Sequence, residues 1–203
     1  MAKVALIGAS GNAGSRILKE LSDRGHQVTG IARNPDKIAT LPGVTAVKGD
    51  VLDKDGLAAL LRGHDAVVSA VHFTASDPQK LIDAVRIAGV KRYVVVGGAG
   101  SLEVAPGQRL IDQPDFPAAY KAEASGGLAF LNLLKMVNDL DWTFLSPSAM
   151  FAPGKRTGKF RLGTEQLLTS EAGSSISFED YAIALVDEIE RPAHVRQRFT
   201  VGY

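Results

Sequence analysis

The chain has 203 residues, 45% of them hydrophobic and 22% charged, which suits one domain with a sizeable buried core. Its 23 basic and 22 acidic residues give a formal net charge of +1, so no overall field would hold it on nucleic acid or on an anionic membrane. The chain has no cysteine, which excludes disulfides, thiolate metal ligands and cysteine nucleophiles and is expected of a reducing compartment. It shows no signal segment and no apolar run near the roughly 20 residues of a membrane span, so we expect a soluble, cytoplasmic protein.

Strand and helix signals alternate along the whole chain. Short apolar runs bounded by turn residues predict strands at residues 4–7, 27–33, 44–47, 66–71, 92–96, 142–145 and 198–201. Apolar residues at helical spacing predict helices at 14–21, 54–62, 78–88, 117–138 and 178–190, and the Gly- and Pro-rich stretch 97–116 predicts a long loop. This alternation predicts an α/β fold with a doubly wound, three-layer parallel sheet, whose ligand crevice opens at the carboxyl ends of the strands.

A glycine-rich loop joins the first predicted strand to the first predicted helix in a G-x-x-G-x-x-G pattern. Glycines there let the chain turn sharply and let backbone N–H groups approach a pyrophosphate at the helix N-terminus. The loop residues expected to contact the pyrophosphate are Gly8, Ser10, Gly11, Asn12, Ala13 and Gly14. The alternative is a purely structural turn.

With dinucleotide binding, residues 1–203 are expected to form a single NAD(P)-binding Rossmann-type domain, with approximately 147–177 and 191–203 as a small substrate-side lobe.

Residues after the second, third and fourth strands are candidates for the rest of the cofactor site. The second strand ends at Arg33 and not at an acidic residue, so a guanidinium can pair with the 2′-phosphate of NADP(H), which is favoured over NAD(H). Asp50 is expected to accept from the adenine amino group and Val51 to pack on the base, while Ala70 and Val71 would lie along the cofactor. Arg33 as a solvated strand end and Asp50 as a turn carboxylate stay open as alternatives.

These motifs resemble the atypical short-chain dehydrogenase/reductases. Within that family the chain is most similar to the NAD(P)H-binding group that includes candidate NADH-flavin reductases and nitrogen-metabolite-repressor-like proteins. The resemblance rests on residues 4–14, 33, 49–51, 66–71, 145–151 and 176–182. It implies a Rossmann fold, a nicotinamide cofactor and a flavin as substrate.

The catalytic motif of typical family members is incomplete here. They use a serine after the fifth strand and a Y-x-x-x-K helix, whose tyrosine is the general acid and base. The serine position looks like Gly97, which would then line the cofactor crevice, with Ser101 as a substitute. Tyr120 does not stand four residues before a lysine, and Lys121 is similar to the lone lysine of repressor-like relatives, which implies contact with the nicotinamide ribose.

Further candidates follow the fourth and sixth strands. His72 would reach the nicotinamide end as a proton donor, or is a structural or exposed histidine. Ser146, Pro147 and Ser148 would line the crevice mouth and contact cofactor or substrate, or are only turn residues. The candidate catalytic set is therefore Tyr120, Lys121, Ser101 and His72. The other histidines show no ligand spacing, so no metal site is predicted.

Three functions are compatible with this sequence. The first is an NAD(P)H-dependent oxidoreductase that transfers hydride to a flavin or quinone-like acceptor, for which the two cofactors carry the reactivity. The second is a redox sensor that holds NADP(H) without turnover. The third is a nucleotide-sugar epimerase or dehydratase, against which the missing Y-x-x-x-K argues. The expected partner is a small-molecule substrate, and the expected protein assembly, if the chain associates, is a homodimer.

Overall fold

The computed structural model describes residues 1–203, in which eight strands form one central sheet. Their order is β10-β12-β8-β5-β4-β1-β2-β3, and every neighbouring pair is parallel except β10 with β12. The strands are β1 (Lys3–Ile7), β2 (Gln27–Ala32), β3 (Val44–Lys48), β4 (Ala66–Ser69), β5 (Arg92–Val96), β8 (Asp141–Pro147), β10 (Arg161–Gly163) and β12 (Gln197–Gly202). The chain moves outward from β1 in both directions, as the predicted doubly wound topology requires.

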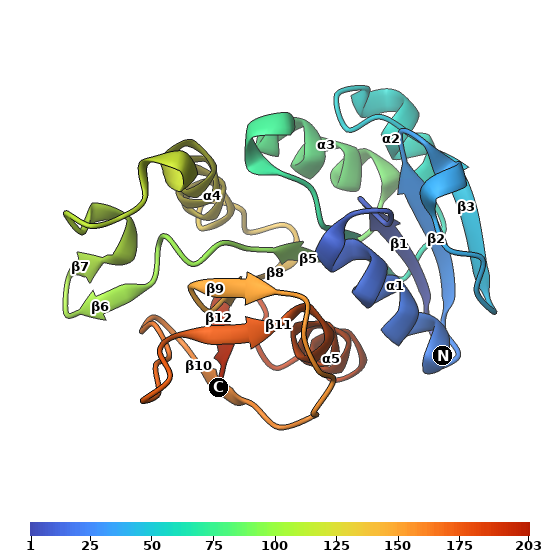
Figure 1. Ribbon diagram of the computed structural model, residues 1–203. Coiled ribbons are helices and arrows are strands. Elements are labelled where there is room, and N and C mark those ends of the chain that lie inside the picture. The colour runs from blue at the N-terminus through green and yellow to red at the C-terminus, as the bar shows by residue number, and fades with distance from the viewer.

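Helices cover both faces of this sheet (Figure 1). The helices α1 (Asn12–Asp23) and α5 (Phe178–Glu190) pack on one face. The opposite face carries α2 (Lys54–Leu61), α3 (Pro78–Ala88) and α4 (Lys121–Leu134). This confirms the three-layer α/β class, and no helix has the length and apolar character that crossing a membrane would need.

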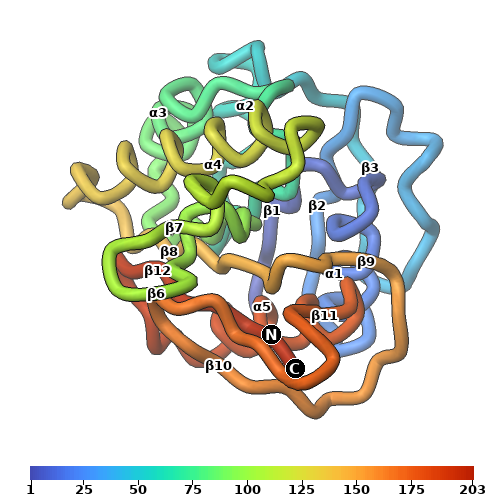
Figure 2. Tube along the Cα trace, turned by 60° about the vertical axis from the view of Figure 1, so that its left-hand side comes forward, coloured from blue at the N-terminus to red at the C-terminus, as the bar shows by residue number.

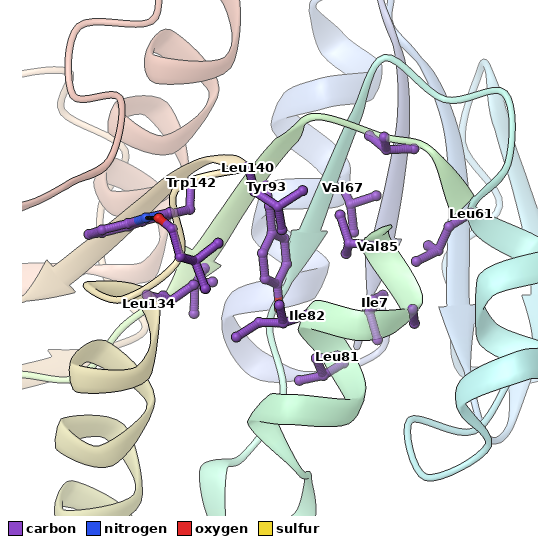
Figure 3. Packing of buried hydrophobic residues seen from close by; sticks show 14 of the residues in the cluster. Ile7, Leu61, Val67, Leu81, Ile82, Val85, Tyr93, Leu134, Leu140 and Trp142 are labelled. Atoms are coloured by element: carbon purple, nitrogen blue, oxygen red, sulfur yellow. Dashed lines mark hydrogen bonds between the residues drawn. The ribbon is translucent and has the colours of Figure 1, made fainter. Parts of the chain in front are cut away.

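The core between the sheet and α2, α3 and α4 contains large side chains from alternate strand positions (Figure 3). Tyr93 of β5 is fully buried and its hydroxyl lies 2.9 Å from that of Ser69 on β4. Burial raises the pKa of Tyr93 above its usual range, so this phenol stays protonated. The indole N–H of Trp142 donates to the carbonyl of Val137 at 3.0 Å, which satisfies the polar atom of a buried aromatic residue.

The local signals for helix ends are realised in the structure. Asp77 caps α3 by accepting from the amides of Gln79 at 2.9 Å and Lys80 at 3.2 Å, and Pro78 occupies the first turn. Gly89 ends the same helix with φ +76°, a left-handed conformation that favours glycine. Short-range chemistry therefore fixes the bounds predicted for α3.

A buried ion pair joins β5 to α5 at the edge of the sheet where the strands begin. Arg92, the first residue of β5, donates to Glu188 at 2.8 Å and to the hydroxyl of Thr143 at 2.7 Å. Glu188 also accepts from the amides of Ala193 at 3.1 Å and His194 at 3.0 Å. Burial lowers the pKa of Arg92, although the charge of Glu188 opposes that shift. The carboxylate thus fixes the segment that leads into β12.

Two predicted boundaries differ from the structure. The stretch 97–116 is not a plain loop, because β6 (Glu103–Ala105) and β7 (Gln108–Arg109) form a small hairpin beside α4. The helix predicted over 117–138 begins at Lys121, after a 3₁₀ turn at Ala118–Tyr120, and ends at Leu134. Pro117 starts that turn in an extended conformation, and the amides of 136 and 137 form short-range turn bonds to Leu133 and Leu134 that end the helix.

Residues 147–177 and 191–203 are divided between two places. β10 and β12 extend the central sheet, so residues 161–163 and 197–202 belong to the Rossmann sheet and not to a separate lobe. The strands β9 (Met150–Ala152) and β11 (Ser175–Ser177) form a separate parallel pair beside α5 (Figure 2). This strand pair stands outside the main sheet.

Candidate functional site

Two glycines of the loop after β1 are required by backbone packing. Gly8 has φ +84°, and a Cβ on it would lie 2.2 Å from the carbonyl oxygen of Ala70. A Cβ on Gly14 would lie 2.0 Å from the carbonyl oxygen of Gly8. The loop is therefore folded tightly against the end of β4, which brings the first turn of α1 to the carboxyl edge of the sheet.

The third glycine leaves room for a ligand at the helix N-terminus. Gly11 is the N-cap of α1 with no side-chain cap, and no acidic residue lies in the first turn. Its own amide donates to Gly8 at 3.0 Å, whereas the amides of Asn12, Ala13 and Gly14 have no acceptor. A Cβ on Gly11 would meet nothing closer than the Gly8 carbonyl oxygen at 3.3 Å. These unpartnered amides fit a pyrophosphate, and Ser10 is exposed on the same loop.

Arg33 follows β2 with its guanidinium free. The side chain is exposed and has neither a hydrogen bond nor a carboxylate partner. Its neighbour Asn34 is engaged differently, because its side chain caps the next turn by accepting from the amide of Asp36 at 3.1 Å. A free guanidinium at this strand end fits a 2′-phosphate, and that contact stays a prediction.

The residues predicted along the rest of the cofactor lie at the same edge. Asp50 has the role of a turn carboxylate, because its Oδ1 accepts from the amide of Leu52 at 2.9 Å, and its Oδ2 has no partner. Val51 and Val71 are half-buried against the core. The amide of Ala70 donates to the carbonyl of Ile7, which continues the β1–β4 pairing past the last strand residue.

The serine of typical family members has no room in this chain. A Cβ on Gly97 would lie 2.4 Å from the ring of Phe144 and 2.7 Å from the carbonyl oxygen of Leu145. Ser101 is only 7% exposed, and its hydroxyl accepts from the buried guanidinium of Arg198 at 3.1 Å. Ser101 therefore faces an internal polar contact, and the structure gives no sign that it replaces the missing serine.

The residues after Leu145 are also turned into the sheet. Ser146, Pro147 and Ser148 are all buried. The Ser146 hydroxyl lies 3.4 Å from Arg198, and that of Ser148 donates to the Val201 carbonyl at 3.0 Å. The two serine side chains thus join β8 to β12, which leaves contact between the crevice and this segment a prediction.

Tyr120 and Lys121 lie at the start of α4. Tyr120 is 65% exposed and its hydroxyl has no partner. Lys121 donates to the carbonyl of Ile111 and its ammonium lies 5.6 Å from the ring centre of Phe116. In this structure Lys121 holds the segment before α4, and its contact with a ribose stays a prediction.

Glu123, which the sequence analysis did not single out, connects α4 to the end of β4. Its carboxylate accepts from the amides of Phe73 at 2.8 Å and Thr74 at 3.0 Å, and from the Thr74 hydroxyl at 2.8 Å. Nδ1 of His72 lies 3.2 Å away. Burial opposes ionisation, but the Thr74 and Phe73 hydrogen bonds lower the pKa of Glu123 below its usual value. No local sequence pattern predicts this contact, because Glu123 lies about 50 positions from His72 and Phe73 in the chain.

One surface hollow, of about 500 Å³, lies elsewhere on the molecule. It is lined mostly by polar residues, among them Lys3, Thr29, Arg62 and His64. These residues stand where β1, β2 and β4 begin, whereas ligands of doubly wound sheets bind where the strands end. The hollow shares no residue with the predicted cofactor site.

Comparisons with known proteins agree with this geometry. A family model described as NAD(P)H-binding matches residues 8–192. This chain is similar to a candidate exported protein from Burkholderia pseudomallei, with 49% identity, a TM-score of 0.91 and full coverage of both chains. It is similar to a candidate epimerase from Bacteroides thetaiotaomicron, with 41% identity and a TM-score of 0.94 over 99% of this chain and 96% of the other. A candidate NADH-flavin reductase from Streptococcus pneumoniae is 37% identical, with a TM-score of 0.84 over 100% and 99% of the two chains.

The family match extends over nearly the whole chain and includes the glycine loop, the strand ends and α4. The unpartnered amides of α1 and the tight glycine packing give that match its physical basis. The chain belongs to the NAD(P)H-binding family.

Proposed function

We propose that this protein is an NAD(P)H-dependent oxidoreductase that passes hydride to a flavin or quinone-like acceptor. Two features together carry the proposal. The N-terminus of α1 has no side-chain cap and can bind an anion, and the end of β5 has no room for the catalytic serine. Similarity to the Streptococcus pneumoniae protein supports a flavin as acceptor. With such acceptors the nicotinamide and the acceptor carry the redox reactivity themselves.

The chain's own residues would bind and orient the two ligands. The amides of Asn12, Ala13 and Gly14 would hold the pyrophosphate, and Arg33 would hold a 2′-phosphate. Asp50 offers its free Oδ2 to the adenine amino group. When bound, NAD(P)H supplies the hydride donor, so these residues act by placing it at the crevice.

A turnover screen tests the proposal. Oxidation of NADPH and NADH would be followed with FMN, FAD, riboflavin and quinones as acceptors. Turnover with at least one of these acceptors is expected. Tight NADPH binding without turnover would contradict the proposal and would indicate a dinucleotide-binding sensor.

Arg33→Ala is expected to weaken NADPH binding by about 10- to 150-fold and to leave NADH binding nearly unchanged. A charge-assisted contact to phosphate contributes about 1.5–3 kcal/mol, and NADH has no 2′-phosphate to lose. Calorimetric titration of both cofactors would measure the change. Arg62→Ala is a matched control, because Arg62 is also exposed and unpaired but lies at the opposite edge of the sheet. Equal wild-type affinities for NADPH and NADH would refute the role of Arg33.

Tyr120→Phe is expected to keep most of the flavin-reducing activity. Its hydroxyl has no partner, and no lysine stands four residues further along the helix to form a tyrosine–lysine pair with it. Steady-state kinetics with the preferred flavin would measure kcat. General acid catalysis typically contributes about 10²–10⁴-fold, so a fall of that size would identify Tyr120 as a proton donor instead.

A further inference from the structure

His72 and Glu123 meet at the edge of the sheet that carries the cofactor loop. β4 pairs with β1 in parallel, with Ser69 opposite Ile7, so the residues after each strand emerge side by side. Ala70 already touches the glycine loop, because its carbonyl oxygen is the atom that forbids a side chain on Gly8. His72 follows two residues later, and Glu123 reaches it from the first turn of α4.

The contact sets the orientation of the imidazole ring. Nδ1 of His72 lies 3.2 Å from Oε1 of Glu123, and the carboxylate can only accept, so the ring hydrogen belongs on Nδ1. Nε2 has no partner and the His72 side chain is 82% exposed. The nitrogen that can exchange a proton with a ligand is therefore the one turned away from the protein.

Glu123 is itself held in place by the segment that it positions. It accepts from Phe73 and Thr74 in addition to His72, so the carboxylate has little freedom to rotate. These bonds also lower the pKa of Glu123, which keeps it an acceptor in the neutral range. An exposed histidine with an anchored carboxylate behind it has the arrangement of a general acid and its orienting partner.

We propose that His72 is the proton donor of this reductase and that Glu123 is its positioning residue. The pair would supply the proton that the tyrosine of a Y-x-x-x-K motif supplies in typical relatives, a motif that Tyr120 does not complete. This inference rests on the proposed function, because it concerns the proton that accompanies hydride transfer to a quinone or flavin. The residue on α4 that matters for the proton is then Glu123 and not Tyr120.

The proton balance of the reaction is simple. A quinone acceptor gains a hydride with both electrons from NAD(P)H, which leaves as NAD(P)⁺, and one proton from the protein. The donor is the imidazolium form of His72, which carries a hydrogen on both nitrogens. Its Nε2–H bond breaks as an O–H bond to the reduced acceptor forms, which leaves the neutral ring with its hydrogen on Nδ1, against Glu123. Solvent returns a proton to Nε2, since the ring is exposed.

The first test is the tautomer of His72, which does not depend on turnover. Nitrogen NMR of the protein, with His72→Ala used to assign the signal, is expected to show the neutral ring protonated at Nδ1. Glu123→Gln offers an amide that can donate to Nδ1, so the hydrogen is expected to move toward Nε2. Thr74→Val is the control: it removes the hydroxyl hydrogen bond to Glu123 but keeps the contact between Glu123 and His72. It therefore shows the effect of a less firmly held loop without a change at the ring. A wild-type ring protonated at Nε2, or no change in Glu123→Gln, would overturn the positioning role.

The second test is kinetic and uses a quinone that the wild type reduces. His72→Ala is expected to lower kcat by about 10²–10⁴-fold, with partial rescue by added imidazole, while the NADPH dissociation constant is unchanged. Glu123→Gln is expected to lower kcat on the order of 10- to 100-fold without rescue. Glu171→Gln, at an exposed carboxylate with no partner, is the control for charge alone. Unchanged kcat in His72→Ala, with an active wild type, overturns this inference and leaves the reductase function standing; an inactive wild type overturns both.

Discussion

Gly11→Val is expected to abolish NADPH binding while the protein stays folded. The φ of −76° at Gly11 is open to any residue, and a new Cβ would lie 3.3 Å from the Gly8 carbonyl oxygen, a close contact that a shift of a few tenths of an ångström relieves. Its branches would occupy the space in front of the amides of 12–14. Losing two or more charge-assisted bonds at about 1.5–3 kcal/mol each predicts a loss of affinity of at least about 10²-fold.

Calorimetry is the appropriate measurement for this variant. Trp142 is buried in the core near the beginning of β8, so its fluorescence is not placed to report on the cofactor. Gly25→Ala is the control, because Gly25 ends α1 with φ +77° and a Cβ there would meet no other atom, so only stability should fall. Gly14→Ala is not a suitable control, because its Cβ would clash with the carbonyl oxygen of Gly8 and disrupt the loop itself. Unchanged NADPH affinity in Gly11→Val would remove the central assignment of the site.

Glu188→Ala is expected to lower the free energy of unfolding by about 3–5 kcal/mol. The variant leaves the guanidinium of Arg92, 11% exposed, without its counter-ion, and Nε of Arg92 already has no partner. It also removes the acceptor of the Ala193 and His194 amides. For a chain of this length each kcal/mol lowers Tm by about 2–4 °C, so a fall of roughly 6–20 °C is expected.

Thermal and urea unfolding would measure this effect against a matched ion pair. Asp139 pairs with Arg86 at 2.7 Å on the surface, and Asp139→Ala is expected to cost no more than about 1 kcal/mol. NADPH binding should be retained by both variants, because Arg92 stands where β5 begins and the cofactor loop where β1 ends. Equal losses of stability in the two variants would show that burial of the Arg92–Glu188 pair contributes nothing.

Much of the fold was accessible to sequence because its signals are local. Helix caps such as Asp77, with Gly89 at the other end, act within a few residues, and strand alternation depends on each strand's own burial. The order of the elements was also informative, because alternating strands and helices with right-handed connections can form only a few sheet topologies. The hairpin at β6 and β7 was missed because its pairing covers only a few residues and a local pattern that short gives no signal.

The sequence by itself determined the fold class, the glycine loop and the position of an arginine after β2, since each follows from the pattern of neighbouring residues. The tertiary structure decided what the individual residues do. It separated Gly8 and Gly14, where a Cβ would lie 2.2 Å or less from a backbone oxygen, from Gly11, where the nearest backbone oxygen is 3.3 Å away. It also placed Glu123 behind His72 and turned Ser101 toward Arg198. The physical reason is distance along the chain: these contacts join residues about 50 and 97 positions apart, and only the packing of the sheet and its helices brings them together.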